Sequence, residues 1–284
     1  MRAAYYKSLD GEVLCKLCPK GCQIAQGTSG LCGVRVNNAG TLHAESYGKV
    51  TSLALDPIEK KPLYHFYPKT MILSVGSYGC NFRCDFCQNY QISMEHPETE
   101  TIMPGELVET ADILKERGNI GIAYTYNEPL VGFEYVLDCA RLAHKRSLKN
   151  VLVTNGFIET KPLKELLPFI DAMNIDLKSA YNSFYNKLGG NFEKVLDSIR
   201  LATAYCHVEV TTLVIPGENS STKEIEDLAK AIASIDDAIP YHITRFFPRY
   251  KMHNYQPTPV ETIKTLVEEA KKHLCHVYLG NCGV

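Results

Sequence analysis

From residue 71 onward, short runs of apolar residues alternate with longer segments in which apolar residues recur at helical spacing. Short apolar runs bounded by turn residues are typical of buried strands, and the longer segments are typical of amphipathic helices. The pattern predicts strands at 71–75, 120–126, 151–154, 173–177, 208–215, 241–247 and 277–279. It predicts helices at 106–117, 131–145, 162–169, 192–204, 223–234 and 260–273.

This alternation indicates an α/β fold in which parallel strands are covered by helices. Continuous apolar strands are typical of parallel sheets, because both faces of such a sheet are buried. The order of elements is compatible with an open doubly wound sheet and with a complete or partial (β/α) barrel. In both architectures ligands bind at the carboxyl ends of the strands. We therefore expect the functional residues directly after the strands.

The first part of the chain has a different texture. Residues 1–68 are rich in cysteine, glycine and short strand-like stretches, and they contain no long helical pattern. The strand-like stretches 34–36 and 42–45 flank a turn-like spacer, which predicts a β-hairpin. Residues 56–63 indicate a connector bounded by prolines. We expect a Cys-rich N-terminal module at 1–68 and an α/β domain at 69–284.

Composition narrows the class of protein. The 284-residue chain has 30 Lys and Arg residues against 32 Asp and Glu residues, and 45% of its residues are hydrophobic. The near-neutral charge gives no basis for a nucleic-acid partner or a membrane-surface partner. No apolar run has the length of a membrane span, and the first residues lack the apolar stretch of a signal peptide. We expect a cytoplasmic protein.

Cysteine is the exception to this average composition, with eleven residues. Clustered cysteines in a reducing compartment indicate metal or redox chemistry rather than disulfides. One group, Cys80, Cys84 and Cys87, directly follows the first strand of the α/β domain. Three thiolates can bind a [4Fe–4S] cluster and leave one iron open for a ligand, whereas a structural zinc site takes four protein ligands. The alternative is a zinc site that a remote His or Cys completes.

The Cys80-x3-Cys84-x-Phe86-Cys87 loop after the first strand resembles the hallmark of the radical S-adenosylmethionine (SAM) enzymes. The resemblance implies a partial (β/α)6 barrel and a [4Fe–4S] cluster on the three cysteines, with SAM bound to the open iron. It also implies reductive cleavage of SAM to a 5′-deoxyadenosyl radical, which abstracts a hydrogen atom from a substrate. Phe86 would then pack near the adenine.

Within this family the chain is most similar to the pyruvate formate-lyase activating-enzyme group, and in particular to the AmmeMemoRadiSam subfamily. The matching stretches are 17–22, 56–63, 79–81, 87–93, 125–129 and 174–178. Two departures accompany the match. Members of the subfamily carry a further cysteine-bearing tail, whereas this chain ends at 280–284. Activating enzymes of glycyl-radical proteins often have Asp where Val153 stands, so a cation site built on that Asp is not expected.

Polar residues follow the second and third predicted strands. Tyr126, Asn127 and Glu128 stand beside a proline turn, a place suited to the ammonium group of a ligand. The resemblance implies that this position contacts the methionyl amine of SAM. The alternative is a turn capped by Asn127 with Glu128 in solvent. Asn155 follows the third strand, where its role is SAM binding or simple turn chemistry.

Further candidates follow the fourth, fifth and sixth strands. A buried Lys178 requires an anionic partner. The resemblance suggests the SAM carboxylate as this partner, and an ion pair with Asp176 is the alternative. Ile215 resembles the backbone platform for adenine. His242 or Arg245 could serve SAM or the substrate, whereas a hydrogen-bonded core histidine is an equal interpretation of His242.

The second cysteine group, Cys15, Cys18, Cys22 and Cys32, lies in a stretch too small to fold by hydrophobic burial alone. Four thiolates suit a structural zinc ion or a second iron–sulfur cluster equally well. A cluster could relay electrons to the SAM-binding cluster or contact substrate, and zinc would hold the module against the barrel. Uncoordinated free thiols are the remaining interpretation.

Three functions are compatible with these features. The first is an oxygen-sensitive radical SAM enzyme that modifies an unidentified small molecule or side chain together with Memo-like partner proteins. The second is an activase that generates a glycyl radical on a partner protein. The third is an iron–sulfur electron carrier without catalysis. Both enzymatic functions require an external electron donor, a ferredoxin or flavodoxin.

Overall fold

A computed structural model describes residues 1–283 of the chain. Its centre is an eight-stranded sheet in the order β15-β14-β13-β12-β11-β10-β8-β7. Every neighbouring pair in the sheet is parallel except β7 and β8, which are antiparallel. The strands are β7 (Ser52–Pro57), β8 (Met71–Gly76), β10 (Asn119–Tyr124), β11 (Lys149–Thr154), β12 (Ala172–Asp176), β13 (His207–Val214), β14 (Tyr241–Arg245) and β15 (Val277–Gly280). All strands predicted after residue 70 are confirmed.

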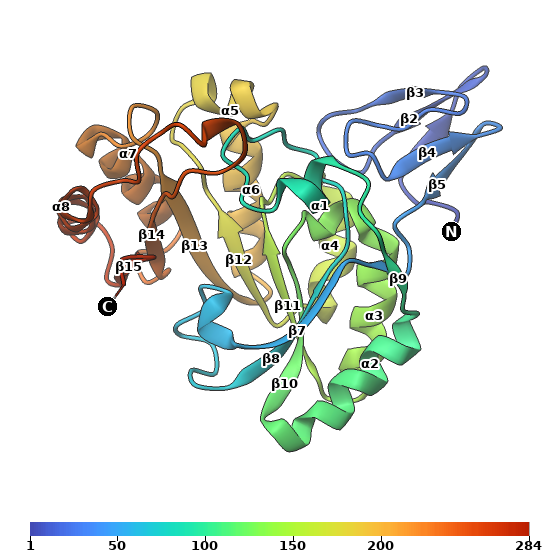
Figure 1. Cartoon of the computed structure of the whole chain (residues 1–284), viewed down its shortest axis with the longest axis horizontal. Coiled ribbons are helices and arrows are strands. Elements are labelled where there is room, and N and C mark those ends of the chain that lie inside the picture. The colour runs from blue at the N-terminus through green and yellow to red at the C-terminus, as the bar shows by residue number, and fades with distance from the viewer. Residues whose placement is uncertain (284) are drawn as a thin grey trace.

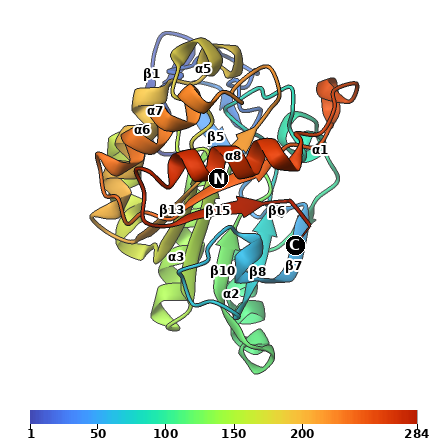
Figure 2. The same cartoon turned by 90° about the vertical axis from the view of Figure 1, so that its left-hand side faces the viewer.

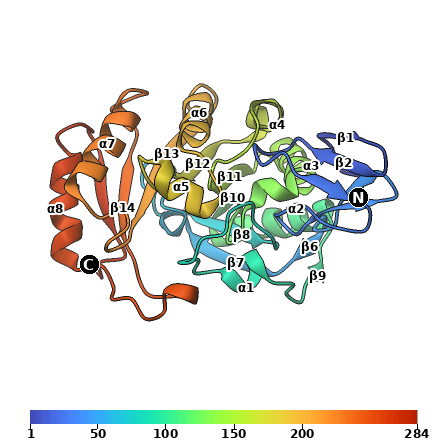
Figure 3. The same ribbon diagram turned by 90° about the horizontal axis from the view of Figure 1, so that it is seen from above.

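Helices connect the parallel strands and pack against the outside of the sheet. They are α2 (Pro104–Ile113), α3 (Phe133–Lys145), α4 (Thr160–Leu166), α6 (Phe192–Thr203), α7 (Thr222–Ala233) and α8 (Val260–Ala270). Figure 3 shows α8, α7, α6 and α4 along the outside of the sheet, and Figure 2 shows α8 lying beside β15. The predicted helices are confirmed. Two short helices that follow strands, α1 (Tyr90–Met94) and α5 (Asn182–Leu188), were not predicted.

The sheet forms a partial barrel whose two edges are β7 and β15. Strand β7 pairs with β8 from Ser52 opposite Gly76 to Pro57 opposite Met71. The large sheet therefore begins at residue 52, and the expected boundary at residue 68 needs correction. Sequence reasoning missed β7 because a half-exposed edge strand lacks the continuous apolar run of the inner strands.

Residues 58–70 are not a loose connector. This floor segment crosses beneath the barrel, near the amino ends of its strands (Figure 1, light blue). Ile58 and Leu63 are fully buried. The Asn174 amide of β12 donates to the Pro62 carbonyl at 2.8 Å. The floor segment thus closes one end of the barrel, and the other end, at the carboxyl ends of the strands, stays open to ligands.

The N-terminal module lies beside the α3 and α4 side of the sheet, far from β15 (Figure 1). It contains an antiparallel sheet of β1 (Tyr6–Ser8), β2 (Glu12–Cys15) and β3 (Gln23–Ala25). The predicted hairpin is confirmed as β4 (Arg35–Asn38) and β5 (Thr41–Ala44). A two-residue strand, β6 (Lys49–Val50), pairs with β9 (Glu100–Thr101) and links the module to the barrel. Among residues 1–283, no helix has the length and apolar character needed to span a bilayer.

Candidate functional site

The cysteine loop, residues 80–87, directly follows β8 and a turn that ends at Gly79. Gly79 has φ +87°, and a Cβ there would lie 2.6 Å from the Cys32 carbonyl oxygen. Both its conformation and its close approach to the N-terminal module therefore require glycine. Cys80, Cys84 and Cys87 all open into one cavity of about 330 Å³ at the carboxyl ends of β8, β10 and β11. The structure brings the three predicted ligands together.

Burial raises the pKa of all three thiols, and that of Cys84 reaches about 12. The thiols therefore lose their protons only when a metal binds, as in other thiolate sites. Within the described chain no three His, Cys, Asp or Glu side chains are arranged to ligate a single metal ion. In an iron–sulfur cluster, by contrast, each thiolate binds a different iron. Three thiols without a fourth in the same cavity fit a [4Fe–4S] cluster with one open iron.

Glu128 lies in the wall of this cavity and is not in solvent. Its carboxylate accepts hydrogen bonds from the Thr154 hydroxyl at 2.6 Å, the Asn155 backbone N–H at 2.8 Å and the Leu130 N–H at 3.0 Å. Burial raises the pKa of Glu128 to about 7, although these hydrogen bonds oppose the shift. A ligand ammonium group beside Glu128 would favour its ionised form, because a nearby positive charge stabilises a carboxylate.

Tyr126 and Asn127 position the cysteine loop. The Asn127 amide donates to the carbonyls of Tyr78 and Gly79 at 3.0 Å each, and it accepts from the Ser77 N–H at 3.0 Å. The predicted turn-capping role of Asn127 thus extends to the turn before Cys80. Tyr126 has φ +73°, which a bulky residue rarely adopts outside functional sites. Its hydroxyl donates to Asp56 at 2.8 Å.

Lys178 lines the same cavity as the three cysteines and lies near Phe86. Lys178 Nζ lies 2.8 Å from Asp176 Oδ2 and 5.9 Å from the centre of the Phe86 ring. Burial alone would lower the pKa of Lys178, but the Asp176 carboxylate outweighs burial and raises it. The ion pair that the sequence left as an alternative is therefore present in the structure. It leaves a cationic Lys178 at the edge of the cavity.

A second cavity of about 610 Å³ continues from the first toward the floor segment. On the side of the cysteine loop this cavity is lined by Cys84, Phe86, Cys87, Tyr126 and Lys178. On the side of β13 and β14 it is lined by Thr211, His242 and Thr244. His242 is buried, and its Nε2 lies 2.6 Å from Glu209 Oε2. The structure thus confirms a hydrogen-bonded interior position for His242, at the wall of a cavity.

Glu209 is the residue that sequence reasoning missed. It lies in β13, fully buried, and accepts hydrogen bonds from two histidine rings and two backbone N–H groups. A charged residue between Val208 and Val210 of a predicted strand was the available signal, because a buried charge requires partners. Its partners from the floor segment lie 144 and 145 residues away in the sequence.

Two predicted residues lie outside both cavities. Ile215 is fully buried, and its backbone N–H donates to the Asn219 side chain at 2.7 Å. Arg245 donates to the Thr258 carbonyl at 2.6 Å and stacks on Phe247, 4.7 Å from the ring centre. Arg245 therefore holds the segment after β14 in this structure, and neither residue belongs to the cavity walls.

Cys15, Cys18, Cys22 and Cys32 line one small cavity inside the N-terminal module. Two features of this cavity stand out. The buried Arg35 reaches it, and the Arg35 Nε has no hydrogen-bond partner in the described structure. At Gly30, a Cβ would fill the space beside Cys22, 3.6 Å from its sulfur. The four cysteines thus share one cavity as free thiols, and among the described residues they are not arranged to ligate a single metal ion.

The two cysteine groups are neighbours in space. Asn81, the residue after Cys80, lines the cavity of the N-terminal cysteines. The Asn155 amide donates to Asn81 Oδ1 at 2.8 Å and lies 3.8 Å from Cys80 Sγ. Arg83 joins the cysteine loop to the N-terminal module, since its guanidinium donates to the Cys80 carbonyl at 2.7 Å and to the Leu31 carbonyl. Asn81, bonded to the Asn155 side chain, therefore lies between the two cysteine groups.

Comparison with known proteins identifies the family. Residues 74–232 match the model of the Radical SAM superfamily. The chain is 42% identical to an uncharacterized protein of Methanocaldococcus jannaschii, over 98% of this chain and 84% of that protein. It is 26% identical to a candidate glycyl-radical enzyme activating enzyme of the same organism, over 75% of this chain and 90% of that protein.

A solved structure shares the fold. The radical SAM methyltransferase from Sphaerobacter thermophilus superimposes with a TM-score of 0.60 at 18% identity, over 75% of this chain and 67% of that chain. The family match covers β8 through α7 and so includes the cysteine loop and the cavity walls at Glu128, Asn155 and Lys178. The chain belongs to the radical SAM superfamily.

Proposed function

We propose that Cys80, Cys84 and Cys87 hold a [4Fe–4S] cluster and that SAM binds in the cavity above and beside it. The observation that carries this proposal is the convergence of three thiols on one cavity walled by polar residues from the ends of neighbouring strands. When bound, such a cluster would supply the electron for reductive cleavage of SAM, which yields the radical chemistry needed to take a hydrogen atom from a substrate.

The residues of the cavity divide the work of holding SAM. Lys178 would exchange its bond to Asp176 for the SAM carboxylate, which its position at the cavity edge favours. Glu128 and Asn155, with the Tyr126 and Asn127 turn, would receive the SAM ammonium group. Phe86 would offer its ring to the adenine. His242 would serve the substrate from the wall of the second cavity, whereas Ile215 and Arg245 lie outside both cavities.

We also propose a second metal centre on Cys15, Cys18, Cys22 and Cys32. The four thiols share one cavity, and the unpartnered Arg35 Nε can donate to a thiolate or a cluster sulfide there. Such hydrogen bonds to sulfur tune the potential of a centre. Zinc and iron–sulfur chemistry both satisfy four thiolates, so metal analysis decides between them.

One experiment tests both centres. The chain is reconstituted under anaerobic conditions, its iron, sulfide and zinc are measured, and dithionite and SAM are added. We expect 5′-deoxyadenosine from the wild type and none from a Cys80/Cys84/Cys87→Ala triple variant. Iron and sulfide that remain in the triple variant would show a second cluster, and zinc would show a structural site. An intact cluster without any 5′-deoxyadenosine would refute the enzymatic function and favour an electron carrier.

The substrate is the finer part of the proposal. We propose that the enzyme acts together with a Memo-like partner protein and modifies a small molecule or a side chain. The floor segment closes one end of the second cavity, which therefore suits a small group. An activase for a glycyl-radical enzyme is the second candidate, and the named relative favours it. The apolar Val153 in the cavity wall counts against it. Transfer of deuterium from a labelled glycine of a partner protein into 5′-deoxyadenosine would establish the activase.

A further inference from the structure

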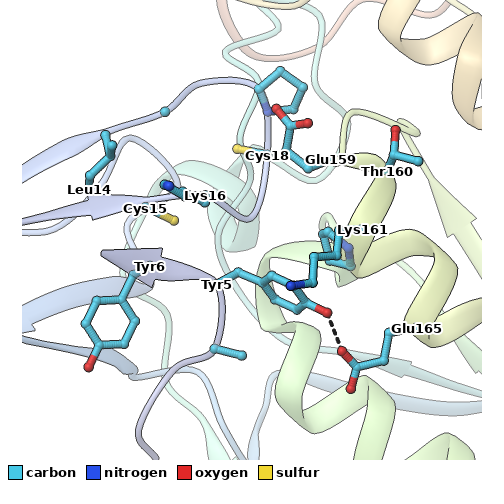
Figure 4. A pocket seen from close by; sticks show the side chains of 14 residues that line it. Tyr5, Tyr6, Leu14, Cys15, Lys16, Cys18, Glu159, Thr160, Lys161 and Glu165 are labelled. Atoms are coloured by element: carbon cyan, nitrogen blue, oxygen red, sulfur yellow. Dashed lines mark hydrogen bonds between the residues drawn. The ribbon is translucent and has the colours of Figure 1, made fainter. Parts of the chain in front are cut away.

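The N-terminal module meets the barrel in two different ways. A groove of about 940 Å³ separates the module from the beginning of α4. Figure 4 shows Tyr5 reaching across this groove to Glu165, and the Tyr5 hydroxyl donates to that exposed carboxylate. Elsewhere the backbone of the module lies directly against the barrel, since a Cβ at Gly79 would be 2.6 Å from the Cys32 carbonyl oxygen. This close contact falls at the start of the cysteine loop.

Arg83 fastens the cysteine loop to the module at the same place. Its guanidinium donates to the Cys80 carbonyl at 2.7 Å and to the Phe82 carbonyl at 3.0 Å. The other terminal nitrogen of the guanidinium donates to the Leu31 carbonyl of the module. A planar guanidinium presents its N–H donors in a fixed fork, which suits carbonyls that converge from two segments. Arg83 therefore acts as a clamp between the two backbones.

The barrel holds the cysteine loop by side chains and leaves its carbonyls to Arg83. Phe82 is fully buried, and the centre of its ring lies 5.2 Å from that of Phe157 and 6.1 Å from that of Tyr185. Within residues 1–283 no other donor contacts the carbonyls of Cys80 and Phe82. The conformation of the backbone at Cys80 thus depends on the Arg83 guanidinium.

We infer that Arg83 is a positioning residue for the SAM-binding cluster, because its clamp fixes the backbone that carries Cys80. The inference rests on the proposed function, since it requires a cluster on the cysteine loop. It goes beyond that function by making the backbone of module residues 31–34 part of the cluster site. This contribution requires no metal in the module, because it runs through the Leu31 carbonyl.

The clamp matters because three thiolates on one short loop hold the whole cluster. The open iron has no protein ligand, so the loop itself must resist opening when ligands at that iron exchange. Hydrogen bonds from a charged donor are stronger than those between neutral groups. Removal of the Arg83 guanidinium should therefore loosen the loop at Cys80 and speed the loss of iron.

The clamp is tested with Arg83→Gln and a matched control, Arg249→Gln, which makes the same chemical change at an exposed arginine. Each chain is reconstituted under anaerobic conditions, and the release of iron to a ferrous chelator is followed. The Cys80/Cys84/Cys87→Ala variant gives the baseline for iron bound elsewhere. We expect Arg83→Gln to release its iron about tenfold faster than the wild type and than Arg249→Gln. Arg83→Lys keeps the charge without the fork and should fall between them.

A second readout separates positioning from a general loss of folding. The reduced clusters are examined by electron spin resonance with and without SAM. We expect the clusters that remain in Arg83→Gln to give an altered signal and a weaker response to SAM, because the surroundings of the thiolates tune a cluster. The Arg249→Gln signal should match the wild type. If Arg83→Gln does not fold, Arg83→Lys provides both readouts.

Two results would overturn the inference. One is equal iron release from Arg83→Gln and Arg249→Gln. The other is a lower cluster content in Arg83→Gln with an unchanged signal, which would give Arg83 a purely structural role. A wild type that binds no more iron than the Cys80/Cys84/Cys87→Ala variant would instead refute the proposed function, because the cysteine loop would then hold no cluster.

Discussion

At the scale of single residues, Glu209 shows how a buried charge is kept in the wall of the barrel. Burial alone would raise its pKa, but hydrogen bonds from His207, His242 and the backbone N–H groups of Tyr64 and His65 outweigh burial and lower the pKa to about 2. Four donors to one carboxylate favour its anionic form. Glu209 therefore holds the His242 ring at the cavity wall and ties the floor segment to β13.

The pH dependence of stability should show this role. The pKa of Glu209 falls from 4.5 to about 2 on folding, which corresponds to about 3 kcal/mol at about 1.4 kcal/mol per unit. Because the folded pKa is lowered, this stability is present above pH 4.5 and is lost as the pH falls toward 2. In Glu209→Gln, the side-chain NH2 group faces two of the donors in place of an acceptor oxygen. The free energy of unfolding should therefore fall by about 3 kcal/mol at neutral pH.

Denaturant unfolding of both proteins between pH 2 and pH 7 gives the measurement. Other carboxylates titrate in the same range, so the informative quantity is the difference between wild type and Glu209→Gln. This difference should shrink below pH 4.5. A difference that stays constant with pH would mean that the substitution acts through packing and not through the charge of Glu209.

Single residues also show the reach of sequence reasoning. Cys80, Cys84 and Cys87 were predictable because one short loop after a strand holds all three, so local spacing determines their meeting. The partners of Glu209 were not predictable, because they come from a segment that folds back from a distant part of the chain. Arg245 was assigned by its position after a strand, yet its side chain turns toward Thr258 and away from the cavity.

At the scale of elements, the floor segment forms part of the wall of the second cavity. Pro57 and Pro62 suggested a connector, because proline punctuates chains at turns. Tertiary packing decides otherwise, since Ile58, Leu63 and Phe66 form a buried cluster with Ile72 and the strand residues Ala123, Val151 and Ala172. The inner strands were predictable from their continuous apolar runs, whereas the floor has no periodic pattern. Its position follows only from its tertiary contacts with β8 and β10 to β13.

A core substitution in the floor segment tests this packing. Leu63→Ala removes a fully buried side chain and should lower the free energy of unfolding by about 2–5 kcal/mol. The control is Leu53→Ala on β7. The Leu53 side chain is 41% exposed, so this substitution should lower the free energy of unfolding far less. Denaturant unfolding measures both, and hydrogen exchange should show faster opening at Tyr64 and His65 in Leu63→Ala only. Similar losses in the two variants would contradict a packed floor.

At the scale of the whole molecule, one buried ion pair joins the N-terminal module to the barrel. Arg35 on β4 and Glu134 on α3 lie 3.0 Å apart, and both are nearly inaccessible to solvent. The Ala4 N–H also donates to Glu134 at 2.7 Å, so the beginning of the chain is held at the same point. Because Arg35 lines the cavity of the N-terminal cysteines, this pair also holds that cavity against the barrel.

Removal of one charge from this pair should therefore loosen the module as a unit. Glu134→Gln leaves the Arg35 guanidinium buried without its counter-charge, and such changes cost about 3–5 kcal/mol. Arg35→Met combined with Glu134→Leu should recover most of the loss, because it removes both charges together. The exposed pair Arg200 and Asp197 supplies the control, since Asp197→Asn should cost less than about 1 kcal/mol. Unfolding curves measure the stability, and limited proteolysis measures the release of residues 1–47. If Glu134→Gln exposed no cleavage site in the module, the ion pair would not be what holds the module against the barrel.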